Sequence, residues 1–231
     1  MKEYEKIMGF EPYTIEELLC YYQQNICELD GFDASHVYLV DNLQTIADQY
    51  GINESCDNTG GFTIPIDGCI VAILNNMSGF DTMEALFHEL THVRDFIWFS
   101  RKYNTNNIHQ HYLYYALQMY SEINAYFLGL KTTIDFLSKG IFALQEPLYS
   151  SMNLEEIIQK YLCCTVIRVE DIVRCLGYIL LYDNFYGIEN HMSHIPDSVS
   201  PRLRGAIQAV LNAYFDNNVE EIYSIIHLLT D

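Results

Sequence analysis

The sequence is poor in positively charged residues. Only 12 Lys and Arg stand against 31 Asp and Glu, so the formal net charge at pH 7 is −19. A nucleic-acid backbone carries the same sign of charge, and no stretch of the chain concentrates enough Lys or Arg to offset the repulsion. We therefore expect no nucleic-acid partner, and we expect the acidic surface to favour basic or neutral peptide segments.

Long apolar runs and paired cysteines are also missing. The longest apolar runs, such as residues 69–74, are much too short to span a bilayer. The first six residues lack the apolar stretch of a secretion signal. The 7 Cys form an odd set without a CxxC pair, which indicates reduced thiols rather than a disulfide framework, and the vicinal Cys163 and Cys164 are interpreted as one buried and one boundary thiol. The sequence predicts a cytoplasmic protein with no membrane association.

The apolar residues that are present suffice for a large core. Hydrophobic residues make up 50% of the chain, aromatic residues 14% and charged residues 19%, which excludes a disordered chain and a fibrous repeat. We find no internal repeat and no low-complexity tract. A length of 231 residues suits one large domain, or a catalytic core with a smaller appendage.

The N-terminal part predicts two helices and a first strand. Thr14 and Glu17 have the spacing of a capping box, and they begin a helix that we expect over 14–29. A β-like run follows at 36–40. A short helix is predicted over 41–50, because the glycine that follows is a typical helix stop.

Residues 61–74 are typical of a β-hairpin. Two apolar runs rich in β-branched residues are joined at Asp67-Gly68, a dipeptide that readily adopts the positive φ angles of a tight turn. Pro65 cannot donate a hydrogen bond to a neighbouring strand. We therefore expect the first arm of the hairpin to lie at an edge of the sheet.

From residue 81 onward the pattern is helical almost to the end of the chain. The fold class is therefore predicted to be α+β and mostly helical, with a small N-terminal sheet or hairpin packed on the first of these helices and a helical bundle after it. The expected helices cover 81–100, 108–138, 153–166, 168–184, 202–215 and 217–229.

An HExxH motif, His88-Glu89-Leu90-Thr91-His92, lies on the first of these helices. Residues four apart lie one helical turn above each other, so both imidazoles point to the same side, where neutral ring nitrogens suit Zn²⁺. Glu89 projects about 100° away around the helix, where it can reach a water on the metal without being a ligand. The sequence therefore predicts a zinc site, with His88 and His92 as ligands and Glu89 as the general base.

A third protein ligand is needed, and Glu122 is the best candidate. It is the one charged residue between Tyr112 and Leu130, and an unpaired carboxylate in such an apolar helix would be costly to bury. Ala125 and Gly129 share its side of the helix and are small enough to allow another helix to approach closely. Other ligands remain open at this stage, namely His109, His111, His191, His194 and Asp95.

HExxH on one helix followed by ExxA, Glu122 to Ala125, on the next is the signature of the gluzincin metallopeptidases, which this sequence resembles. Its surroundings are similar to the small immunity-region and stress-response metallopeptidases of phages and mobile elements. In these a helix and a β-hairpin ending in a run like residues 70–75 precede the HExxH helix. The resemblance covers roughly residues 36–130.

The resemblance implies one zinc ion per chain, held by His88, His92 and Glu122, with Glu89 as general base. It also implies that the hairpin strand lines the cleft and pairs with an extended peptide. The implied organisation is a zincin-like catalytic core over 1–140, containing the hairpin and both motif helices, and a helical C-terminal subdomain over 141–231 packed on it.

Some gluzincins carry an acidic residue four positions after the ligand glutamate, where it orients a zinc histidine. This sequence has Tyr126 there, so Tyr126 and Asp95 are the candidates for that orienting role. A peptidase also needs a group that stabilises the oxyanion. We consider His191, His194 and Tyr186 for this role, because they lie in or beside an irregular segment that could fold over the cleft.

The predicted function is a zinc metallopeptidase acting on a peptide or protein, such as a transcription regulator. One alternative is a regulatory interaction module that keeps the zincin fold with little or no turnover. The other is a helical binding module without metal. Metal content distinguishes the metal-free helical module from the other two hypotheses. Peptide digestion with and without a chelator distinguishes the metallopeptidase from the regulatory module.

Overall fold

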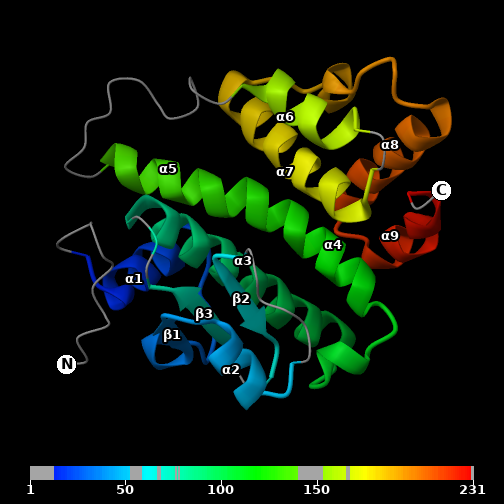
Figure 1. Cartoon of the computed structure of the whole chain (residues 1–231). Coiled ribbons are helices and arrows are strands. Elements are labelled where there is room, and N and C mark those ends of the chain that lie inside the picture. The colour runs from blue at the N-terminus through cyan, green and yellow to red at the C-terminus, as the bar shows by residue number, and fades with distance from the viewer. Residues whose placement is uncertain are drawn as a thin grey trace. The chain divides into compact units, whose positions relative to one another are not determined.

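The computed structural model describes residues 13–52, 59–66, 69–75, 77, 79–139, 153–164 and 167–229. Over these residues the chain is mostly helical with one small three-stranded sheet (Figure 1), as the predicted α+β class requires. Its contacts divide it into two compact units, one ending at His109 and the other beginning at Gln110. The expected boundary at 140/141 lies outside the described residues and stays a prediction.

The sheet of the first unit has the strand order β1-β3-β2. β2 (Gly61–Ile64) pairs antiparallel with β3 (Ile70–Leu74), which confirms the hairpin, and the expected turn at Asp67-Gly68 lies outside the described residues. β2 is an edge strand that ends immediately before Pro65, as predicted. β1 (Val37–Val40) pairs parallel with β3 at the other side, and α2 (Gln44–Gln49) follows it.

Helix α3 (Gly79–Tyr103) packs on β2 and β3 and forms the centre of the first unit. An apolar stripe at helical spacing is fully buried at four positions of α3, Met83, Leu86, Leu90 and Val93. A neighbouring face of α3 is buried at Phe87 and Thr91, where Tyr22 of α1 (Ile15–Asn25), which begins at the predicted capping box, contacts it. The Tyr22 hydroxyl donates to the Thr91 hydroxyl of α3 at 3.0 Å.

The second unit consists of helices. The helix predicted over 108–138 is divided into a 3-10 turn, η3 (Ile108–Gln110), then α4 (Tyr114–Asn124), a π-helical turn, η4 (Ala125–Gly129), and α5 (Leu130–Lys139). The remaining elements are α6 (Leu154–Leu162), α7 (Val169–Tyr186), η6 (His191–His194), α8 (Pro201–Phe215), α9 (Val219–Ile225) and η7 (Ile226–Leu228).

Helix α7 is the central helix of this unit and contacts α4, η4 and α6. Gly177 allows its close approach to η4, since a Cβ at Gly177 would lie 2.4 Å from the Cβ of Tyr126 and 3.0 Å from the carbonyl oxygen of Ile123. The π-helical turn therefore contacts α7 at Gly177, and this contact positions the side chains around Tyr126.

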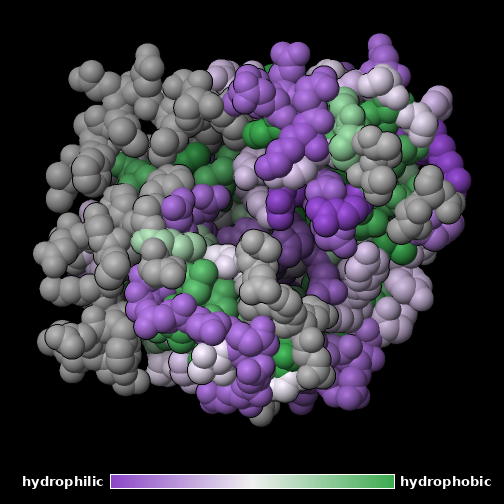
Figure 2. Space-filling model, viewed as in Figure 1, coloured by the Kyte–Doolittle hydropathy of each residue, from purple (hydrophilic) through white to green (hydrophobic). Residues whose placement is uncertain are grey.

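The surface agrees in part with the sequence-based expectations. None of the described helices is both long and apolar enough to cross a membrane. The expectation for Cys163 and Cys164 is wrong, because both thiols are exposed at the end of α6, where the helix stops. On the face shown in Figure 2, hydrophobic residues form small areas separated by hydrophilic ones.

Candidate metal centre

His88 and His92 lie one turn apart on α3, and their rings are arranged edge to face. Their Nε2 atoms are 3.2 Å apart, and the ring planes meet at 79° with centroids 4.9 Å apart. His92 is 8% exposed and His88 is half-buried. The helix therefore brings two imidazole nitrogens to one point at the edge of its buried surface.

This spacing suits a shared metal ion. Two ligands of a tetrahedral zinc ion, each about 2.0–2.1 Å from the metal, stand about 3.3 Å apart. The observed 3.2 Å between the two Nε2 atoms is close to that value. Without a metal the same contact is a hydrogen bond, which requires one ring to donate and the other to accept.

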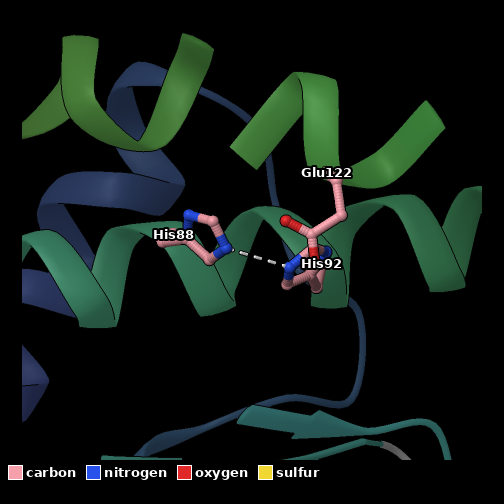
Figure 3. A group of neighbouring side chains, drawn as sticks. All are labelled: His88, His92 and Glu122. Atoms are coloured by element: carbon pink, nitrogen blue, oxygen red, sulfur yellow. Dashed lines mark hydrogen bonds between the residues drawn. The ribbon is translucent and has the colours of Figure 1, made fainter. Parts of the chain in front are cut away.

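Glu122 of α4 completes the group. The ligand atoms of His88, His92 and Glu122 lie within 4.8 Å of one another, and this is the one group of its kind among the described residues. Figure 3 shows the Glu122 carboxylate directed from its helix toward the His92 ring. This group of two nitrogen donors and one carboxylate could hold a metal ion.

No protein-family model, no curated protein and no solved structure matches this chain. The chemistry of the group therefore follows from its own donor atoms and their spacing.

Glu89 points to the sheet. Its side chain is 5% exposed, and the Thr63 hydroxyl of β2 lies 2.8 Å from Oε2 and 3.1 Å from the Glu89 carbonyl oxygen. Thr63 has one proton, so it donates to one of these oxygens at a time. Gly61 adjoins the same side chain, because a Cβ there would lie 3.2 Å from Glu89 Cγ. The general-base candidate is thus held against the edge strand.

Asp95 is a nearly inaccessible carboxylate on α3, and it is 2% exposed. Its Oδ1 accepts hydrogen bonds from Nε and Nη2 of Arg94, at 2.9 Å and 2.5 Å. The charge of this carboxylate is therefore balanced by its neighbour in sequence. An orienting role for Asp95 toward a zinc histidine stays a prediction.

His191 and His194 hold a buried carboxylate instead of belonging to the metal group. His191 Nδ1 and His194 Nε2 each lie 2.6 Å from one oxygen of Asp183, whose side chain is fully buried near the end of α7. Tyr186 is half-exposed and packs on the Tyr182 ring. These contacts give the two histidines a structural role, and an oxyanion role for any of the three stays a prediction.

The other two histidines that were open as ligands lie near the start of the second unit or just before it. His109 is exposed in η3, and partial burial lowers its pKa. His111 packs on the Tyr112 ring, and its Nδ1 accepts a hydrogen bond from the backbone N–H of Leu113. Among the described residues, neither belongs to a group that could hold a metal.

Tyr126 lies one turn beyond Glu122, where the helix is π-helical. Burial raises the pKa of the Tyr126 phenol, the nearby Arg174 guanidinium opposes this, and the Glu122 carboxylate raises it further. Tyr126 is therefore near Glu122, as an orienting residue would need to be, and it also hydrogen-bonds with Arg174.

The sequence did not single out Thr63 in the first unit or Tyr161 and Arg174 in the second. Thr63 carries no local signal, because its contact to Glu89 joins residues 26 positions apart. Arg174 did carry a local signal, because it is the single Lys or Arg in the largely apolar α7, just as Glu122 is the single charged residue in its helix.

Glu84 lies one turn before His88 on α3. Burial raises the pKa of the Glu84 carboxyl, and the charge of His88 opposes this.

Proposed function

We propose that this protein is a zinc metallopeptidase of the gluzincin type, with His88, His92 and Glu122 as metal ligands. The observation that supports it is the convergence of two imidazole nitrogens 3.2 Å apart with a carboxylate, all within 4.8 Å. Two histidines and one glutamate are a donor set of catalytic zinc sites, which keep a fourth position open. Zinc would supply a lowered pKa for a bound water and polarisation of a peptide carbonyl.

Glu89 is the general base in this proposal. Its carboxylate would accept the proton of the attacking water and deliver it to the amine that leaves when the peptide bond breaks. Thr63 restrains the carboxylate by donating to Oε2. A restrained base needs less reorganisation when the proton moves, which is why β2 is part of the proposed catalytic machinery.

β2 would also receive the substrate. It pairs with β3 along one side and is the edge of the sheet on the other. An extended peptide can add to such an edge through main-chain hydrogen bonds. Because Thr63 and Gly61 of this strand contact Glu89, a peptide on the edge would run past the proposed base.

Metal content tests the ligand set. We expect about one zinc per chain in the purified protein, and loss of that zinc in His88→Ala, His92→Ala and Glu122→Gln. His227→Ala is the matched control, because this histidine is exposed on η7. Wild-type protein that binds no zinc even when zinc is supplied would refute the site and support the helical module without metal.

Peptide digestion tests the reaction. Glu89→Gln should keep its zinc and lose cleavage by about 10²–10⁴-fold, the usual contribution of a general base. The measurement is digestion of a peptide library by wild type, by chelated wild type and by the variant. A zinc-loaded wild type without any cleavage would contradict the enzyme and favour the regulatory module, and full activity of Glu89→Gln would remove Glu89 from its role.

A further inference from the structure

The guanidinium of Arg174 is held between two tyrosine rings. Its Cζ lies 5.0 Å from the ring centroid of Tyr126 on η4 and 5.5 Å from that of Tyr161 on α6. Nη1 donates to the Tyr161 hydroxyl at 3.3 Å, and the guanidinium also hydrogen-bonds with Tyr126. Two aromatic faces and two hydroxyls thus fix the position of one cation.

No described carboxylate forms an ion pair with Arg174, although its charge lowers the pKa of Asp171, one turn earlier on α7. Four other arginines each pair with a carboxylate, as Arg168 does with Asp171 at 3.0 Å. Arg174 forms no such ion pair with any described residue, although acidic residues outnumber basic ones more than twofold. The two rings and the two hydroxyls replace part of the solvation that this half-buried cation loses, but they carry no full negative charge.

The Nε–H group of Arg174 also lacks a hydrogen-bond acceptor among the described residues. Nε is buried, and few buried donors in folded proteins lack an acceptor. Burial works to lower the pKa of Arg174, but the hydroxyls of Tyr161 and Tyr126 outweigh it and raise the pKa. The group stays charged, and the described residues offer it neither an acceptor for Nε nor an ion-pair partner.

The site lies beside Glu122. Tyr126 follows Glu122 by four residues, and the Glu122 charge acts on the Tyr126 phenol. Gly177, three residues after Arg174, seats α7 directly on Tyr126. This seating positions the guanidinium next to the helix that carries the proposed metal ligand.

We propose that Arg174, framed by Tyr126 and Tyr161, binds a carboxylate group of a peptide. A guanidinium offers a planar fork of N–H donors that matches the two oxygens of a carboxylate, and such a ligand would supply the ion-pair partner that no described residue provides. The carboxylate can come from an Asp or Glu side chain or from a peptide C-terminus. As a determinant of substrate choice, the site rests on the proposed peptidase function, whereas the binding itself does not.

The binding is tested by nuclear magnetic resonance of the arginine Nε–H groups in the full chain. A buried Nε–H exchanges slowly with water and gives an observable signal, which is assigned by its loss in Arg174→Lys. We expect acetate to shift this signal saturably and chloride at equal ionic strength not to. Arg202→Lys is the matched control, because this exposed arginine belongs to the same unit.

Two further probes distinguish the sources of the carboxylate. N-acetylalanine offers a terminal carboxylate, and N-acetylglutamic acid α-amide offers a side-chain carboxylate. The probe that resembles the natural ligand should bind at least tenfold more tightly than the other. Tyr161→Phe removes the hydroxyl that orients Nη1, keeps the ring, and should weaken binding while leaving the fold intact. An acetate response equal to that of chloride in wild type overturns the proposal.

The outcome is separable from that of the peptidase proposal. If carboxylates bind at Arg174 and no peptide is cleaved, the carboxylate site stands and the peptidase proposal fails. If peptides are cleaved but acetate leaves the Nε–H signal unmoved, this inference fails and the peptidase proposal stands. If both hold, Arg174→Lys should raise KM at least tenfold for a carboxylate peptide and leave KM unchanged for its amide.

Discussion

At the scale of single residues, the site depends on contacts of two kinds. His88 and His92 meet because a helix repeats every 3.6 residues, and any HExxH helix would place them so. Glu89 is different, because its carboxylate is directed by Thr63, which belongs to another element. The same helix without β2 would leave that carboxylate to solvent.

Thr63→Val tests this dependence. The substitution keeps the shape of the side chain and removes the hydroxyl that lies 2.8 Å from Glu89 Oε2. A hydrogen bond to a charged group is worth about 1.5–3 kcal/mol, so we expect kcat to fall by about tenfold or more. Zinc content should not change. The measurement is steady-state kinetics on a peptide found in the library digestion.

Thr59→Val is the matched control for this variant. Thr59 precedes the same strand, and its hydroxyl donates to the Gly61 carbonyl oxygen rather than to Glu89. Its kcat should stay near that of wild type. Equal losses in the two variants would show that Thr63 acts through the strand and not through the base.

At the scale of elements, close packing of α7 on the π-helical turn positions the Arg174 neighbourhood. Long helices tolerate a π turn where its altered register serves packing or function. Here the turn begins at Ala125, and the backbone of α7 at Gly177 packs directly on Tyr126, because no side chain separates them. The two features are matched, since a side chain at position 177 would collide with backbone and Cβ atoms.

Gly177→Ala should therefore lower the free energy of unfolding by about 1–3 kcal/mol, because the new methyl must push α7 off η4. Gly205→Ala on α8 is the matched control. Nothing lies within 4 Å of a Cβ there, so alanine should stabilise the helix by about 0.5–1 kcal/mol. Urea unfolding of both variants measures the change in the free energy of unfolding. Changes of the same sign in the two variants would contradict the packing described.

The elements also show how far the sequence predicts the fold. The capping box at Thr14, the edge position of β2 and the apolar stripe of α3 were all predictable, because each depends on residues close in the chain. The parallel pairing of β1 with β3 was not, since it joins Val37 to Val71 across an intervening helix. The π-helical turn left no mark that periodicity could detect.

At the scale of the whole molecule, buried ionisable groups make stability depend on pH. Burial raises the pKa of Cys69 and of Cys175 to about 12. Unfolded thiols ionise near pH 8.5, so between about 8.5 and 12 the unfolded state binds fewer protons than the folded state. The free energy of unfolding should therefore fall as pH rises through this range, by about 2 kcal/mol per thiol at pH 10.

Urea unfolding at about pH 8 and pH 10 measures this loss of unfolding free energy. Cys175→Ala should make the loss smaller by the contribution of one thiol. Cys20→Ala should leave the loss unchanged, because the Cys20 thiol is exposed. A stability that is level over this pH range would show that these thiols ionise as readily in the folded protein as in the unfolded chain.

The sequence by itself determined the two histidines one turn apart, the glutamate between them and the choice of Glu122, because helical spacing and an isolated charge can be recognised locally. The tertiary structure alone decided that Thr63 restrains Glu89, that His191 and His194 serve the buried Asp183, and that Arg174 lies between Tyr126 and Tyr161. The physical reason is distance along the chain. Local backbone geometry relates residues within one or two turns, whereas packing relates residues that only a folded core brings together.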